Sequence, residues 1–140
     1  MIRKIYSKVD PAVLLHTIYT HERAPVSHEG AKSHLTEPSH FLQAVSFSMP
    51  SGAESKPHTH NAQERVTSHT HEALLVFKGS IELSIYDIDN TLIERVVLKE
   101  GDCYVIFAGG HSIRALESAQ LFEFKNGPYN GPEKDRTFIN

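Results

Sequence analysis

Short stretches rich in apolar residues recur along the chain after residue 40. In the clearest stretch, Ile81, Leu83 and Ile85 alternate with Glu82 and Ser84, which is the two-residue period of a half-buried strand. Turns rich in glycine, proline, aspartate and asparagine separate the stretches. Short strands separated by turns are typical of an all-β sandwich or barrel. The pattern predicts strands at 41–47, 73–77, 81–86, 92–98, 103–107 and 119–124.

The two ends of the chain have a different pattern. Asp10 is a favourable N-cap, Pro11 suits the first helical position, and apolar residues follow as far as Ile18, so a short N-terminal helix is expected. The polar stretch 21–39 contains prolines and a glycine and is predicted to be a long loop. After Asn126, two Gly-Pro pairs favour a surface tail. We therefore expect a helix-and-loop extension at 1–40, a barrel at 41–125 and a tail packed on the barrel at 126–140.

Composition narrows the function classes. A chain of 140 residues suits one domain, and 39% apolar residues suffice for a core. The net charge of -3 lacks the basic excess typical of nucleic-acid binders. No apolar run is long enough to span a bilayer, and the first residues lack the features of a secretory signal. Cys103 is the single cysteine, so no internal disulfide forms, and its place in a predicted strand favours a buried core residue over a reactive thiol. We expect a cytoplasmic protein that binds neither nucleic acid nor membrane.

Histidine is unusually frequent, with ten residues in 140, and it is the commonest metal ligand. Positions i and i+2 of a strand point to the same face, so His58 and His60 can direct both imidazoles into one cavity. Two exposed histidines on a strand would have the same spacing, so the pair alone leaves both interpretations open. Five histidines nearer the N-terminus lack such spacing and are interpreted as surface groups: His16, His21, His28, His34 and His40.

The residues around this pair resemble the first sequence motif of the cupin superfamily. Gly52, His58 and His60 have the spacing that opens the motif. Glu72 and Gly79 have the spacing between the glutamate and the glycine that close it. This match implies that the glutamate begins the strand predicted at 73–77.

The second cupin motif also has a counterpart. Gly101-Asp102 leads to Gly109-Gly110-His111, as the family's Gly-Asp leads to a final histidine. The resemblance extends from about Phe41 to Phe124 and implies a double-stranded β-helix, the jelly-roll barrel of cupins. It also implies that four side chains face inward and bind one divalent metal ion: His58, His60, Glu72 and His111.

The chain departs from the family pattern at two places. Glu72 follows His60 by twelve positions, so residues 61–71 must form an inserted loop. Glu64 has the more usual spacing but lacks the following glycine, and because the pleat sets strand register we prefer Glu72 as the ligand. Phe107 replaces the usual proline before the final histidine, which arrives one residue early, so we expect a distorted corner at His111.

The chain is also similar to a group of small, stand-alone bacterial cupins. The shared segments are Pro57-His58-Thr59-His60, Glu64-Arg65, Thr70-His71-Glu72, Gly101-Asp102, Gly109-Gly110-His111 and Gly127-Pro128-Tyr129-Asn130-Gly131. His71 replaces a glutamine of that group. If Glu72 points inward, His69 and His71 point outward and are interpreted as exposed. A register slip of one residue would make His71 a ligand instead.

Three imidazoles and a carboxylate suit iron, manganese, nickel, cobalt or zinc. An octahedral ion with four protein ligands keeps two positions open for substrate, water or dioxygen, which makes catalysis plausible. Glu64 is a candidate general base, and Arg65 is a candidate anchor for an anionic substrate. Arg95 and Arg114 are further candidates for the anchor. Tyr86 and Tyr104 are weaker candidates for a general acid.

Three functions follow from these residues. The first is a metal-dependent enzyme that acts on a small polar molecule, sugar-like or carboxylate, either as an isomerase or epimerase or as a dioxygenase. The second is a non-catalytic cupin that binds or senses a small ligand. The third is a structural role in which the metal only holds the barrel together. A homodimer is expected from the resemblance and from the need to cover sheet edges.

Overall fold

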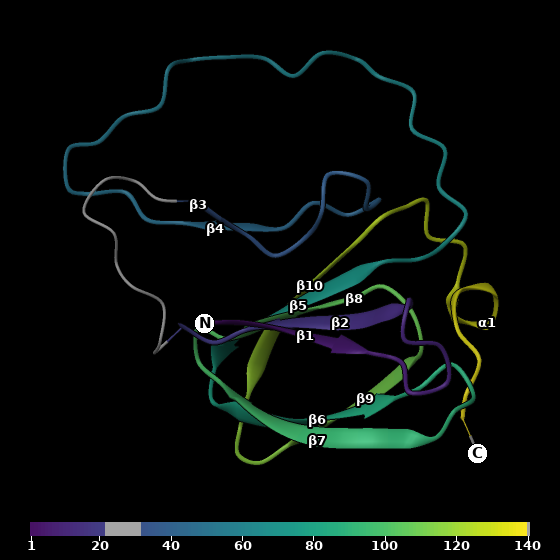
Figure 1. Ribbon diagram of the computed structural model, residues 1–140. Coiled ribbons are helices and arrows are strands. Elements are labelled where there is room, and N and C mark those ends of the chain that lie inside the picture. The colour runs from purple at the N-terminus through teal and green to yellow at the C-terminus, as the bar shows by residue number, and fades with distance from the viewer. Residues whose placement is uncertain (22–31, 140) are drawn as a thin grey trace.

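The computed structural model describes residues 1–21 and 32–139, in which antiparallel strands make up almost all of the regular secondary structure (Figure 1). The large sheet has the strand order β1 (Ile2–Tyr6), β2 (Leu14–Tyr19), β8 (Cys103–Ile106), β5 (Glu72–Lys78) and β10 (Gln120–Lys125). The small sheet has the order β7 (Leu92–Lys99), β6 (Ser80–Tyr86) and β9 (Gly110–Ala115). A separate hairpin consists of β3 (Lys32–His34) and β4 (Val45–Phe47), and α1 (Pro132–Asp135) is a single helical turn. The predicted all-β class is therefore confirmed.

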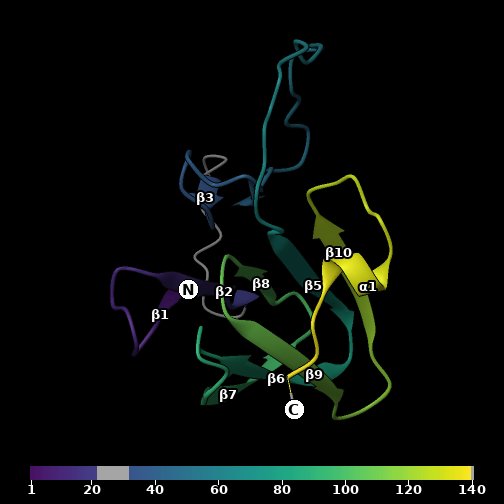
Figure 2. The same cartoon turned by 90° about the vertical axis from the view of Figure 1, so that its right-hand side faces the viewer.

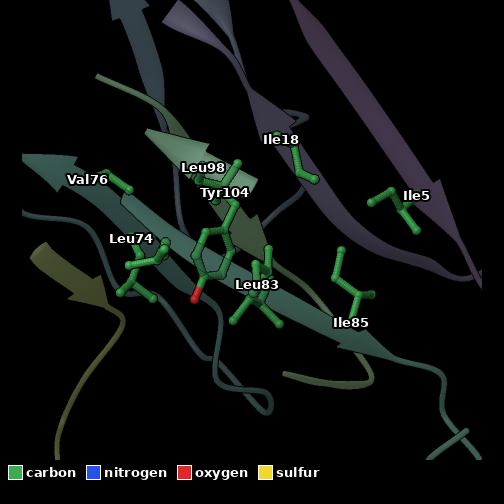
Figure 3. Close-up of a cluster of buried hydrophobic side chains, with 10 residues drawn as sticks. Ile5, Ile18, Leu74, Val76, Leu83, Ile85, Leu98 and Tyr104 are labelled. Carbon is green, nitrogen blue, oxygen red and sulfur yellow. The ribbon is translucent and has the colours of Figure 1, made fainter. Parts of the chain in front are cut away.

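The central strands of the large sheet, β2, β8 and β5, are largely buried on both faces. One face packs against the small sheet, and Leu74 and Tyr104 from the large sheet meet Leu83 and Ile85 from the small sheet in this core (Figure 3). Each such side chain, when fully buried, contributes about 1.5–3 kcal/mol of hydrophobic stabilisation. The opposite face is covered by the segment 35–44, whose apolar residues form a second cluster with the large sheet.

The predicted N-terminal helix is wrong. The carbonyl of Asp10 accepts a hydrogen bond from the Val13 N–H at 2.9 Å, and its carboxylate accepts one from the Ala12 N–H at 3.0 Å. Asp10 and Pro11 thus form the turn between β1 and β2, because the residue types that cap helices also suit turns. The residues after the turn pair with β8, from His16 opposite Ile106 onward, and this non-local pairing overrides the local helix signal.

The first forty residues contribute β1, β2 and β3, and β2 lies inside the large sheet between β1 and β8. Five of the predicted strands correspond to β5, β6, β7, β8 and β10. Of the stretch predicted at 41–47, only Val45–Phe47 forms a strand. In the described part of the chain, no helix is long and apolar enough to cross a bilayer.

The two sheets do not close into a barrel. β9 pairs only with β6, and β10 pairs only with β5, so each sheet ends in a strand with one unpaired edge among the described residues. The segment 48–71, which precedes β5, has neither helix nor strand and is almost entirely exposed. Figures 1 and 2 show it as a long arc that extends away from both sheets.

Candidate functional site

A cavity of about 440 Å³ lies where β5 and β9 begin. Asp135, the last residue of α1, and residues 136–139 line it from the other side. Its polar lining residues are Thr70, Glu72, Tyr86, His111, Ser112, Asp135, Arg136 and Thr137. Its size falls in the range of small-molecule sites, which span about 300–1,000 Å³.

Two of the predicted metal ligands meet in this cavity. Oε1 of Glu72 lies 3.4 Å from Nε2 of His111. Burial raises the pKa of Glu72, and the nearby carboxylate of Glu123 adds to this shift. Burial lowers the pKa of His111, and the carboxylate of Glu123 opposes that shift. The imidazole is therefore neutral at pH 7, and the contact is polar rather than an ion pair.

The strand register places Glu72 on the inner face of the large sheet. It is the first residue of β5 and shares its face with Leu74 and Val76, which are core residues between the two sheets. Opposite Glu72 lie Ile106 of β8 and Lys125 of β10. The prediction that Glu72 faces inward from the start of this strand agrees with this register.

A glycine corner positions His111. Gly109 has φ +71°, and a Cβ atom there would collide with the carbonyl oxygen of Tyr86. Only glycine fits this close approach of backbone to backbone in a left-handed conformation. β9 then runs in regular register, with His111 opposite Ile85 of the core. The expected distortion is thus confined to the corner and does not extend into the strand.

His16 lies beneath this site, so its interpretation as a surface residue is wrong. Its side chain is fully buried, and neither ring nitrogen has a hydrogen-bond partner in the described part of the chain. Burial, with a smaller contribution from His111, lowers the pKa of His16 to about 3. The backbone of Gly110 partly opposes the lowering of the His16 pKa. It makes no hydrogen bond of good geometry to either ring nitrogen.

Tyr104 is the second buried polar neighbour of the site. Its ring centroid lies 6.2 Å from that of His16 and 6.2 Å from that of His111. Its hydroxyl is buried without a partner among the described residues. Burial and then the charge of Glu72 raise its pKa well above the usual value, which makes Tyr104 a poor acid at neutral pH.

The other predicted site residues lie outside the cavity. His58 and His60 are exposed in the segment 48–71, with ring centroids 5.2 Å apart. Glu64 and Arg65 are exposed in the same segment. Among the described residues, no three histidine, cysteine, aspartate or glutamate side chains are placed to hold a metal ion. This conformation thus presents two of the four predicted ligands together, Glu72 and His111.

The second histidine pair divides between surface and interior. His69 is exposed, as expected, but His71 is buried, so its interpretation as an exposed residue is wrong. His71 does point to the face opposite Glu72, but the segment 35–44 covers that face. Its ring stacks on Phe41 at a centroid distance of 5.3 Å and meets Phe107 edge-on at 5.3 Å.

The remaining candidates have structural surroundings. Arg95 and Arg114 lie 3.9 Å and 3.2 Å from Glu82, away from the cavity lining. Tyr86 lines the cavity. Burial raises the pKa of the Cys103 thiol to about 12, which fits the expected inert core residue.

Sequence analysis did not identify the residues that close the cavity. Lys125 pairs with Asp135 at 2.7 Å and lies 3.5 Å from Glu123. Arg136 follows Asp135 and lines the cavity. The tail shows no periodic pattern, and its glycines and prolines indicate only a surface location, so no signal in the sequence places it beside Glu72.

In comparisons with known proteins, no family model, no curated protein and no solved structure matches the chain.

Proposed function

We propose that this protein is a cupin that binds one divalent metal ion and acts on a small polar molecule. Glu72 and His111 would supply two ligands, and His58 and His60 would supply the other two. The contact between Glu72 and His111 carries the proposal, because two ligands predicted from separate motifs come from different sheets and meet at one cavity.

The unclosed side between the two sheets supports a more specific fold, the double-stranded β-helix. Ile113 pairs with the core residue Leu83, so its side chain belongs to the inner face of β9, yet it is 43% exposed. An apolar inner face beside an unpaired edge lacks a covering strand. The segment 48–71 leads directly into Glu72 and has no structure of its own. Long structureless loops in compact domains are usually either functional or linker segments. Closure by part of this segment would bring the two remaining histidines toward the cavity.

The ligand set and the cavity define the chemistry. A metal held by imidazoles and a carboxylate would act as a Lewis acid or a redox centre. Thr70, Ser112 and Thr137 line the cavity with hydroxyls, which suit hydrogen bonding to a polar molecule. The neutral imidazole of His111 has a lone pair free to bind a metal at pH 7, which a protonated ring lacks.

Metal content tests the proposal. We would measure bound metals by elemental mass spectrometry on tag-free protein, for wild type, His60→Ala, Glu72→Gln and His111→Ala. The matched control is His34→Ala, since His34 is exposed on β3. We expect about one equivalent of metal in wild type and in the control, and a clear loss of bound metal in the three ligand variants. No uptake by wild type after reconstitution would exclude the proposed metal site.

A non-catalytic cupin that binds a small ligand is the second candidate. It is favoured by the position of Glu64 and Arg65, because the expected base and anchor both lie outside the cavity lining. Metal-loaded protein that binds a small polar molecule reversibly and releases it unchanged would support this candidate over an enzyme.

A further inference from the structure

We infer that Arg136 anchors a carboxylate group of the cavity's ligand, so that the small polar molecule is a carboxylic acid. This inference rests on the proposed function and names its substrate class.

Arg136 is placed at the cavity by the chain around it. Its backbone N–H donates to the carbonyl of Pro132 at 3.1 Å and ends α1. On one side Asp135 is held by Lys125 at 2.7 Å, and on the other Ile139 packs against Gly110. Contacts before and after it therefore fix the segment against both sheets, which distinguishes Arg136 from an arginine on a free tail.

Arg136 borders the same cavity as the two central residues of the site. Glu72 and His111 lie 3.4 Å apart at the point where β5 and β9 begin. All three residues line the same cavity. A ligand that contacts Glu72 and His111 is therefore within reach of this guanidinium.

The guanidinium is also available for a ligand. Asp135, its neighbour, is already paired with Lys125, and among the described residues Arg136 makes no ion pair. Arginine carries five N–H donors in a planar fork that matches the two oxygens of a carboxylate. Two parallel charge-assisted hydrogen bonds fix orientation as well as affinity.

The surrounding charges select the kind of anion. Glu72 and Glu123 lie near the cavity, and their charges would repel an anion. Lys125 is already paired with Glu123 and Asp135. A divalent ion on Glu72 would reverse this repulsion, so we expect anion binding to require the metal. One free arginine suits a singly charged carboxylate better than a phosphate, which carries up to two charges and more acceptors.

The test is binding of defined probes to metal-loaded and metal-free protein by isothermal titration calorimetry. The probes are pyruvate and L-lactate as singly charged carboxylates, inorganic phosphate as the competing anion, and ribose as a neutral molecule. The variants are Arg136→Gln, which removes the charge, and Arg136→Lys, which keeps the charge but loses the fork. Lys134→Gln is the control, because it removes one positive charge from the same exposed turn without touching this cavity.

We expect a carboxylate to bind metal-loaded wild type and Lys134→Gln alike, and to bind Arg136→Gln about tenfold to hundredfold more weakly. Arg136→Lys should fall between them. Equal affinity in Arg136→Gln and Lys134→Gln would overturn the inference, as would binding of ribose or phosphate in preference to both carboxylates. Absence of carboxylate binding to metal-loaded wild type would overturn it as well.

Metal content separates this inference from the proposed function. Arg136→Gln should retain about one equivalent of metal, because Arg136 is not a ligand. Full metal content without carboxylate binding rejects the role of Arg136 alone, whereas wild type without metal rejects the proposed function.

Discussion

Nε2 of His111 and Oε1 of Glu72 lie 3.4 Å apart, although His111 is the second residue of β9 in the small sheet and Glu72 is the first residue of β5 in the large sheet. Both groups are shifted toward their neutral forms, because burial raises the pKa of the acid and lowers that of the imidazole. A metal ion would have to displace any proton that the carboxyl group of Glu72 carries, so metal binding to this pair should depend on pH.

The titration of His111 should depend on the charges around the cavity. In metal-free protein we expect its pKa to lie below 6.5 and to rise in Arg136→Gln, since removal of a nearby cation makes protonation easier. Glu123→Gln should shift the pKa in the opposite direction, because that carboxylate favours the protonated ring. Histidine ring resonances followed by NMR against pH measure both effects. Identical curves for the two variants would show that neither charge reaches the ring.

Acid should destabilise the protein partly through His16. Its folded-state pKa is about 3, below its unfolded value near 6.5, so the unfolded chain binds more protons between these values. This residue alone should therefore lower stability by about 2–3 kcal/mol as the pH falls from 6.5 to 4.5. Glu72 has the opposite sign, because its raised pKa makes the folded state bind the extra proton.

Urea denaturation at several pH values separates these contributions. His16→Leu removes a buried ring without partners, so it should flatten the loss of stability below pH 6.5. His34→Leu, at an exposed position, should keep the wild-type slope. Equal slopes in all three proteins would contradict the assignment to His16.

Asp102 should contribute stability rather than catalysis. Its carboxylate accepts hydrogen bonds from the backbone N–H groups of His21 at 2.8 Å and Lys99 at 2.9 Å. Asp102→Ala leaves both donors without this acceptor and should cost about 2–4 kcal/mol. Asp102→Asn keeps one carbonyl acceptor and should cost less. Thermal unfolding compares them, and a melting temperature unchanged in Asp102→Ala would rule out this role.

Gly109→Ala should disrupt the corner that positions His111. The added methyl group would meet the carbonyl of Tyr86 in a backbone conformation that alanine rarely adopts, so we expect a loss of about 2–4 kcal/mol together with weaker metal binding. Gly52→Ala is the matched control, because Gly52 has φ +82° but no heavy atom within 4 Å of the added Cβ. Gly52→Ala should lower the free energy of unfolding by only about 1 kcal/mol. Calorimetric unfolding and metal content would measure both effects, and equal losses in the two variants would contradict a role for packing at this corner.

Tyr104→Phe tests whether the buried hydroxyl serves a ligand. The hydroxyl has no partner in the described part of the chain, so its removal should leave the ligand-free protein unchanged or more stable by up to about 1–2 kcal/mol. Urea unfolding of the metal-free protein measures this change. A loss above about 1 kcal/mol would show that an internal water or another group already pairs with the hydroxyl.

Much of the large-scale organisation could be read from local patterns. Apolar alternation in 81–86 located β6, the run 92–98 after the turn at Asp89-Asn90 located β7, and the motif spacing between Glu72 and Gly79 located the start and end of β5. The same alternation placed Glu72 and His71 on opposite faces of that strand, as the structure has them. It did not indicate that His71 is buried, because the cover over its face comes from the distant segment 35–44.

The sequence by itself determined the all-β class and most of the central strands, because strand period and turn residues are local properties. Its resemblance to the cupin motifs supplied the two ligand candidates that now meet. Only the tertiary structure decided that β2 replaces a helix, that His16 is buried, and that Arg136 borders the cavity. Each of these depends on pairing or packing between residues far apart in the chain, such as Ile18 opposite Tyr104, and no local pattern contains that information.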